Sequence, residues 1–149
     1  MRRAWRAAGP GRLRVLMLAL ALLSGCSLNP PLELDTLAPA GTAVRLSSVP
    51  FFAQSEFQCG PAALAGVLGA AGVATDPATL SPQVYLPARE GSLQLELVAA
   101  TRRAGRLPYV LAGEPRALLA QLQAGRPVLV LQNLGTARVP VWHYAVLTG

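Results

Sequence analysis

Several residue types are scarce in this chain of 149 residues, and the shortages narrow its possible functions. No lysine occurs, and all 13 basic residues are arginine. Five arginines precede residue 15, so the segment 26–149 carries eight arginines against seven acidic residues. A net charge near +1 offers no basic surface for a phosphate backbone, which argues against nucleic-acid binding. No phosphate-binding loop motif occurs either, and we expect no cofactor and no bound metal.

The excess of positive charge belongs to the first 25 residues, which have the pattern of a signal peptide. An arginine-rich start, Met1–Arg14, precedes nine apolar residues, Val15–Leu23. Nine residues are too few to cross a bilayer as a helix but suit the apolar region of a secretory signal. We therefore expect export from the cytoplasm.

The end of this signal, Leu23-Ser24-Gly25-Cys26, resembles the bacterial lipobox. The resemblance implies cleavage before Cys26, a diacylglycerol on its thiol and acylation of the new amino terminus. Several acyl chains anchor a protein stably to a membrane. Ser27, which follows the cysteine, favours the outer membrane facing the periplasm. An ordinary signal peptide with a chance cysteine is the alternative.

A proline-rich tether, residues 26–43, separates the anchor from the remaining chain. Its three prolines and its lack of apolar periodicity predict a partly extended linker. With Cys26 lipidated, Cys59 has no partner for a disulfide. An unpaired thiol in an oxidising compartment needs a reason, which is either chemical reactivity or burial as an inert core residue.

One domain, residues 44–149, is expected to follow. A helix is predicted from Gly60 or Pro61 to Ala70 or Ala71, closed by Gly72, because Pro61 suits a first turn. Its apolar residues recur at helical spacing, and its small residues allow packing on the other sides, so we expect a buried central helix. The predicted buried stripe is Leu64, Val67, Leu68 and Ala71.

Helices precede most strands in this domain, an order that predicts an α+β fold with the cysteine helix on an antiparallel sheet. The final strand alternates, which places His143, Ala145 and Leu147 on one face. Trp142, Tyr144 and Val146 take the other face, and both aromatic residues are expected in the core. The other predicted elements are an edge strand within Val44–Phe52, a loop over Asp76–Glu90 with at most one short helix capped by Asp76, a helix over Leu93–Ala104 capped by Ser92, a strand over Leu107–Ala112, a helix over Pro115–Ala124, a strand over Pro127–Leu131, a loop over Asn133–Pro140 and a strand over Val141–Leu147.

Cys59 stands at the predicted start of the central helix, where a thiol can become a nucleophile. A free cysteine has a pKa of about 8.5 and supplies little thiolate at neutral pH. A helix N-terminus favours the negative charge, and an imidazole can take the proton. His143 is the one imidazole in the chain. The backbone N–H of Cys59 and the side-chain amide of Gln54 are candidate donors to an oxyanion, and the adjacent Gln58 is a weaker candidate.

The pattern Gln54-x4-Cys59-Gly60-Pro61-Ala62, followed by an apolar helix and a distant His143-Tyr144-Ala145-Val146, resembles the bacteriocin-processing double-glycine peptidase family. The likeness covers roughly residues 49–149 and is greatest to exported, stand-alone relatives. It implies a papain-like fold with Cys59 as nucleophile, His143 as general base and acid, and Gln54 in the oxyanion hole.

Three features depart from that family. Its third catalytic residue, an Asp or Asn, follows the histidine strand and is expected beyond Gly149, on the interpretation that residues 44–149 are a truncated domain. Asn133 is the internal substitute by residue type, although it precedes the histidine strand. The chain has no transporter segment, and the lipobox puts the domain outside the cytoplasm.

The sequence therefore predicts a thiol peptidase of the bacterial envelope that hydrolyses a peptide bond through an acyl-enzyme. Its expected partners are a peptide or protein substrate and the membrane that holds Cys26. Two alternatives stay open. One is a cell-wall amide hydrolase that uses the same Cys59 and His143 pair. The other is a lipoprotein that binds peptides without catalysis on a degenerate peptidase fold.

Overall fold

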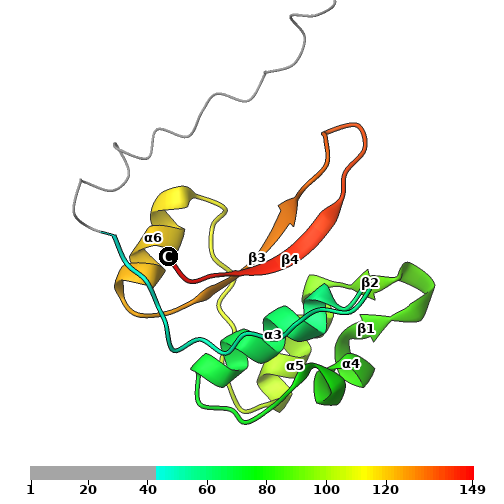
Figure 1. Cartoon of the computed structure of the whole chain (residues 1–149), viewed down its shortest axis with the longest axis horizontal. Helices are drawn as coiled ribbons and strands as arrows, with labels where there is room; N and C mark the ends of the chain where they lie inside the picture. Colours follow the sequence, from blue (N-terminus) through cyan, green and yellow to red (C-terminus); the bar gives the residue numbers. More distant parts are fainter. Residues whose placement is uncertain (1–42) are drawn as a thin grey trace, which may run out of the picture. The chain divides into compact units, whose positions relative to one another are not determined.

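The computed structural model describes residues 43–149, whose secondary structure is mixed. Four α-helices, one 3-10 helix and two small antiparallel sheets occur in the described range (Figure 1). The α+β class is thereby confirmed. The elements are α3 (Cys59–Ala70), α4 (Pro77–Val84), β1 (Tyr85–Leu86), the 3-10 helix η1 (Pro87–Arg89), β2 (Gly91–Ser92), α5 (Gln94–Arg103), α6 (Pro115–Gln123), β3 (Val128–Asn133) and β4 (Trp142–Leu147).

The expected signal segment (1–25), the lipid-bearing Cys26 and nearly all of the tether (26–43) lie outside the described residues. Within the range 43–149, no helix combines the length and apolar content that a membrane crossing requires.

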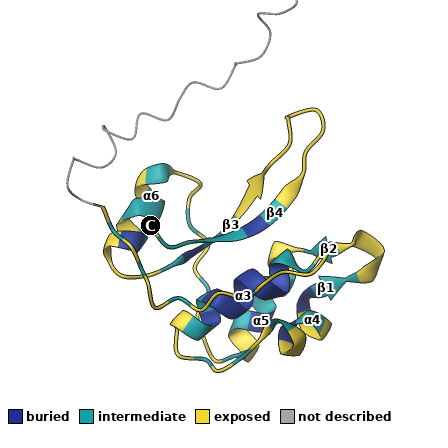
Figure 2. Cartoon of the chain, in the orientation of Figure 1, coloured by how far each residue is buried: buried dark blue, intermediate teal, exposed yellow. Residues whose placement is uncertain are grey.

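Helix α3 forms the centre of the core, as expected. Leu64 and Leu68 are 1% and 2% exposed, and Ala65 is fully enclosed. The small side chains of the helix let neighbouring elements approach it from several sides, so burial extends around most of its circumference (Figure 2). The prediction was wrong for Ala71, which caps the helix and is exposed. Residues from α4, α5 and β4 complete the core: Leu80, Val84, Leu97, Ala100 and Tyr144.

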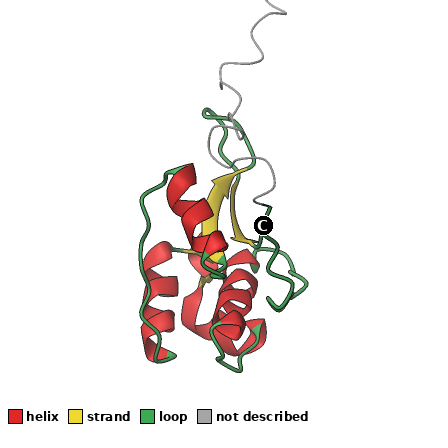
Figure 3. Ribbon diagram, turned by 90° about the vertical axis from the view of Figure 1, so that its left-hand side faces the viewer, coloured by secondary structure: helices red, strands yellow, loops and turns green. Residues whose placement is uncertain are grey.

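Strands β3 and β4 pair antiparallel beside the helices (Figure 3) and form the longer sheet. The register sets Leu131 opposite Tyr144 and Gln132 opposite His143. The predicted strand is confirmed as β4, in which Tyr144 is buried and Val146 packs against the core, although burial does not alternate along its length. Trp142 was wrongly assigned to the core, because its side chain is 61% exposed.

The segment before α3 runs along that helix instead of forming the predicted edge strand. A single backbone hydrogen bond, from Leu46 N to Thr148 O at 2.7 Å, joins it to the end of β4. Farther on, Pro50 lies against the glycines of α3. A Cβ at Gly66 would sit 3.1 Å from the carbonyl oxygen of Pro50, and one at Gly69 would sit 2.8 Å from its ring. The glycines thus permit a close crossing that larger residues would prevent.

The region 76–92 contains more structure than the sequence suggested. The expected short helix is α4, and its cap is confirmed because the side chain of Asp76 accepts a 2.7 Å hydrogen bond from Thr79 N. The rest was expected to be a loop, but β1 and β2 pair as a hairpin with Tyr85 opposite Ser92. Strands of two residues carry too little alternation to be detected by periodicity.

Two further predictions were wrong. No strand occurs over Leu107–Ala112, where Pro108 lacks a backbone donor for a sheet ladder. Ser92 does not cap the helix that follows, because α5 begins at Gln94 and its capping position is Leu93, without a side-chain hydrogen bond. The Ser92 hydroxyl therefore makes no hydrogen bond to the backbone of α5.

Candidate active site

Cys59 is the first residue of α3 and carries a free, half-buried thiol. The hydrogen bond from Ala62 N to the carbonyl of Gln58, 3.2 Å long, closes the first turn. The N–H groups of the preceding residues therefore have no acceptor within the helix. No acidic side chain occupies this turn. The thiol thus lies at the positive end of the helix dipole.

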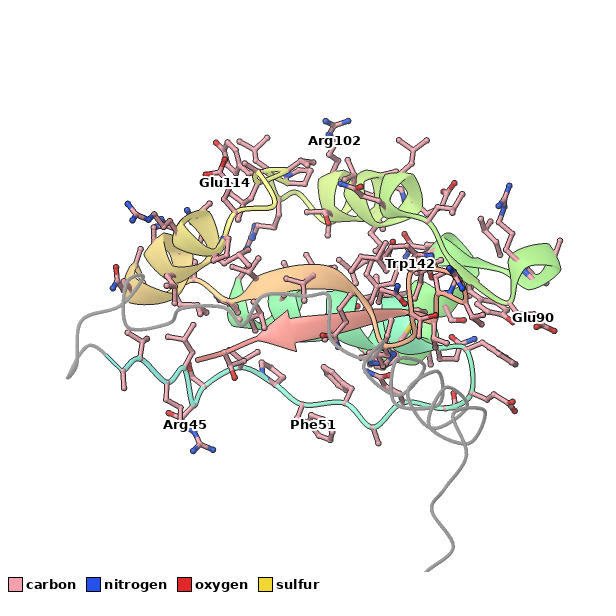
Figure 4. The ribbon with its side chains drawn as sticks, turned by 90° about the horizontal axis from the view of Figure 1, so that it is seen from above. Arg45, Phe51, Glu90, Arg102, Glu114 and Trp142 are labelled. Atoms are coloured by element: carbon pink, nitrogen blue, oxygen red, sulfur yellow. The ribbon has the colours of Figure 1, made fainter. Side chains whose placement is uncertain are left out.

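The predicted residues Gln54, Cys59 and His143 all line one cavity of about 810 Å³. The loop before α3 forms one wall, the β1–β2 hairpin a second, and the start of β4 a third. Figure 4 shows Glu90 of the hairpin and Trp142 of β4 at the same end of the domain. The remaining lining residues are Ser55, Glu56, Phe57, Arg89, Gly91, Ser92, Leu93, Gln94, Leu131 and Tyr144.

The loop leading into Cys59 has an unusual backbone conformation. Phe57 has a φ of 59°, in the left-handed region that residues with a side chain seldom adopt. This turn brings the chain from the exposed Gln54 into the first turn of α3. Glu90, across the cavity, is the second such residue in the described part of the chain, with a φ of 48°. Both left-handed positions thus border the same cavity.

The two glutamines near Cys59 have different environments. Gln58 accepts a 2.8 Å hydrogen bond at its Oε1 from the Ser81 hydroxyl of α4 and does not line the cavity. Its amide therefore ties the helix start to α4. Gln54 lines the cavity and is exposed, which leaves its amide available to a ligand. Of the two, Gln54 is the better candidate for an oxyanion donor.

Asn133, the internal candidate for orienting His143, is engaged in the β3–β4 turn. Its Oδ1 accepts hydrogen bonds from Gly135 N at 2.9 Å and from Val141 N at 2.8 Å. Its Nδ2 donates to the carbonyl of Thr136 at 3.1 Å. This amide therefore closes the turn and cannot also hold the imidazole.

Gly60 and Ser92 form a close contact that sequence reasoning missed. A Cβ on Gly60 would lie 2.6 Å from Ser92 Cβ and closer still to Ser92 Oγ. Ser92 Oγ is fully enclosed and has no hydrogen-bond partner, the one such side-chain atom among residues 43–149. A buried hydroxyl without a hydrogen-bond partner costs folding free energy. The Gly60–Ser92 contact is therefore closely packed but leaves the Ser92 hydroxyl unpaired. The sequence feature that could have indicated this contact is Gly60 itself, a residue without a side chain next to Cys59.

Tyr144 is the most buried aromatic residue at the site. Its ring lies against the start of α3, with Cδ2 at 3.7 Å from the position of a Cβ on Gly60. Burial raises the pKa of Tyr144 above its ordinary value of 10.0, and the negative charge of an ionised Cys59 raises it further. The hydroxyl of Tyr144 is therefore harder to ionise than that of a tyrosine in solvent.

The charged residues at the cavity are few and do not form a metal site. Within the described range, no cluster of three or more His, Cys, Asp or Glu side chains has an arrangement suited to a metal ion. Glu56, Arg89 and Glu90 border the opening and are exposed. The chemistry available to the described residues is therefore that of a thiol, an imidazole, hydroxyls and amides.

Known proteins add nothing to these observations. No family model, curated protein or solved structure matches the chain. The functional argument therefore depends on the residues that surround Cys59.

Proposed function

We propose that the chain is a cysteine peptidase with a papain-like fold in which Cys59 is the nucleophile. The observation that supports this best is the shared cavity of Cys59, His143 and Gln54. Three residues distant in sequence line one space, and their side chains are those that thiol catalysis of acyl transfer requires. The position of Cys59 at the start of α3 supports the same assignment.

In the proposed reaction His143 takes the proton of the Cys59 thiol as the sulfur attacks a peptide carbonyl carbon. The tetrahedral intermediate collapses when the C–N bond breaks, and His143 gives its proton to the leaving amine. An acyl-enzyme remains on the sulfur. Water then attacks the thioester with His143 as base, which releases the acid and restores the thiol.

The negative oxygen of the tetrahedral intermediate needs donors fixed in advance. The backbone N–H of Cys59 and the side-chain amide of Gln54 are proposed for this task. Loss of one such donor typically lowers kcat by a factor of about 10² to 10³. A Gln54→Ala variant should therefore lose activity while its thiol remains reactive, because Gln54 acts only once the oxygen carries charge.

The lipobox resemblance gives the proposed location. We place the enzyme in the bacterial envelope, anchored through lipid on Cys26 and acting on peptides or proteins of that compartment. Metabolic labelling with a radioactive fatty acid tests the anchor directly. Label should enter the parent chain and be absent from the Cys26→Ser variant. Label retained in that variant would refute the lipid assignment.

The first test of catalysis is the rate at which iodoacetamide alkylates Cys59 as the pH is raised. The full chain carrying Cys26→Ser, held in mild detergent, has Cys59 as its single thiol. A working thiol–imidazole pair predicts an alkylation rate that levels off well below pH 8.5. In His143→Ala the whole profile should shift to higher pH. A slow rate that rises only above about pH 8 in both proteins would indicate an inert thiol.

The second test uses substrates. Fluorescently labelled casein should be cleaved by the chain and not by Cys59→Ala. Cleavage of purified peptidoglycan fragments with no action on casein would replace the peptidase assignment with cell-wall amide hydrolysis. Inactivity on both, with the biological role intact in Cys59→Ala, would identify a peptide-binding lipoprotein.

A further inference from the structure

The end of the β3–β4 hairpin, residues 131–142, exposes a group of apolar side chains. These residues, here called the hairpin tip, form the longest continuous run of exposed residues within 43–149. Figure 1 shows the turn projecting beyond the helices, and Figure 2 shows it exposed. An apolar group of this kind on a protein surface typically marks a site of interaction. Its large hydrophobic residues, 48% to 69% exposed, are Leu131, Leu134, Val139, Val141 and Trp142.

The apolar side chains lie on both faces of the hairpin. Residues opposite each other in an antiparallel pair share a face, and successive residues alternate. Asn133 is opposite Trp142, so Trp142 and Leu131 share one face. Leu134 and Val141, joined by a 2.8 Å backbone hydrogen bond, take the other face. A partner lying against one face would leave the other in water, whereas a surrounding apolar medium covers both.

The backbone of the hairpin tip satisfies most of its polar groups internally, which is what a lipid environment demands. The side chain of Asn133 accepts hydrogen bonds from two amides of the turn and donates one to the carbonyl of Thr136. The Thr136 hydroxyl accepts a 3.1 Å hydrogen bond from Val139 N. A loop that stays in water does not need these bonds. The amides bonded within the hairpin tip are those of Leu134, Gly135, Thr136, Val139 and Val141.

The charge of this region suits an anionic surface. Arg138 is the only charged residue in 131–142, and no Asp or Glu occurs in 115–149. A guanidinium binds phosphate well, and an arginine side chain can extend from apolar surroundings to lipid headgroups. Trp142, at the far end of the hairpin tip, is of a residue type enriched where membrane meets water. The surface chemistry therefore matches the headgroup level of a bilayer.

We propose that the hairpin tip inserts at the headgroup level of an anionic lipid bilayer, with Arg138 on a phosphate and the apolar side chains against the upper acyl chains. The inference goes beyond the proposed function and requires neither catalysis nor lipid on Cys26. Leu131 and Trp142 also line the candidate active site. Insertion would therefore hold the opening of that cavity at the membrane surface.

Trp142 can report on insertion directly. The chain has two tryptophans, so Trp5→Phe leaves Trp142 as the single one. The full chain with this change is reconstituted into vesicles of phosphatidylethanolamine and phosphatidylglycerol, with and without bromine on the acyl chains. Bromine should quench the emission of Trp142, and the emission should lie at shorter wavelength than in detergent-free buffer. Emission that bromine leaves unchanged would refute the proposal without any variant of the hairpin.

Variants of the hairpin tip measure the contribution of its side chains. Leu134→Ser and Val139→Ser should each lower the ratio of inserted to free hairpin, obtained from the quenched fraction, roughly tenfold, because a side chain left in water gains no transfer free energy. Leu95→Ser is the matched control, since Leu95 is 72% exposed on α5 and lines neither the candidate active site nor the second cavity beside α3. Equal quenching in the hairpin variants and the control would contradict the proposal.

Arg138→Gln tests the contact with phosphate. This change should lower the ratio of inserted to free hairpin roughly fivefold in the anionic vesicles. In vesicles of phosphatidylcholine alone the effect should be smaller, because the surface carries no net charge. An equal effect in both would show that the arginine does not respond to anionic lipid.

A different result would assign the hairpin tip to a second copy of the chain. In that case the emission of Trp142 would shift to shorter wavelength without vesicles as the protein concentration rises, and brominated lipid would not quench it. That outcome would replace membrane insertion with self-association.

Discussion

Replacing Gly60 with alanine tests how closely the β1–β2 hairpin fits against the start of α3. The new methyl group would lie 2.6 Å from Ser92 Cβ, well inside van der Waals contact. Rotation about the Ser92 side chain can move its hydroxyl but not its Cβ. Because Ser92 is paired with Tyr85 in the hairpin, its backbone must shift to make room.

Two opposing effects determine the expected magnitude. Alanine in place of glycine within a helix favours folding by about 1 kcal/mol. Overpacking a tight contact typically costs about 1–3 kcal/mol. Here the clash involves the Cβ of Ser92, which cannot rotate away, so we place the cost of overpacking at the upper end of that range. Gly60→Ala should therefore lower the free energy of unfolding by about 1–2 kcal/mol, a fall in Tm of roughly 4–8 °C.

A double-mutant cycle measured by urea unfolding isolates the contact. Ser92→Gly removes both clashing atoms, so it should rescue Gly60→Ala with a coupling energy of about 1–3 kcal/mol. Ser92→Ala alone should be neutral or stabilising, because it deletes a buried hydroxyl that lacks a partner. Gly113→Ala is the control, since a Cβ there meets no atom within 4 Å. A Gly60→Ala chain as stable as the parent, or coupling near zero, would refute the reasoning.

Three further changes test other parts of the fold. The hydrogen bond from Thr79 N lowers the pKa of Asp76 below its ordinary value of 3.8. The cap therefore stabilises the fold above the unfolded-state pKa, and this contribution is lost as the pH falls through the lower folded-state pKa. Asp76→Asn keeps an acceptor but should flatten that acidic part of the curve of Tm against pH, and an unchanged curve would remove Asp76 as its cause. Arg106 donates from Nε and Nη2 to the carbonyl of Ala71 at 3.1 and 3.0 Å, so Arg106→Gln should cost about 0.5–1.5 kcal/mol in urea unfolding, whereas no loss would mean that the exposed pair is inconsequential. Asn133→Ala breaks three hydrogen bonds within the β3–β4 turn, so it should accelerate hydrogen exchange of the turn amides. The rate of Cys59 alkylation should change little. A large fall in that rate would show that the turn supports the site.

The sequence predicted α3, and the three residues proposed for catalysis line one cavity, for identifiable reasons. Helix α3 combines a proline in its first turn with small residues and regular apolar spacing, and these signals act within a few residues of one another. Gln54 and Cys59 lie close to that helix start in sequence, and His143 lies in the apolar segment that forms β4. Local patterns of this kind survive in the folded chain because no tertiary contact opposes them.

The remaining features depend on contacts between distant segments. The partnership of Gly60 with Ser92 exists only after the hairpin has packed on α3, and nothing local to Ser92 distinguishes it from a helix cap. Trp142 has the same apolar character as Tyr144, yet it lies beyond the end of the core and stays exposed. Position along the strand, rather than residue type, decided between the two.

The walls of the candidate active site have a consequence for the chain before it folds. Gln54 and Cys59 lie near the start of the described segment and His143 lies near its end, so their approach requires contacts of long range in sequence. Such contacts form late, because closing a long loop costs entropy before any contact is gained. In the proposed exported peptidase, the chain would therefore hold a thiol without its imidazole during synthesis and export. The proposed activity would accordingly appear only after the chain has folded.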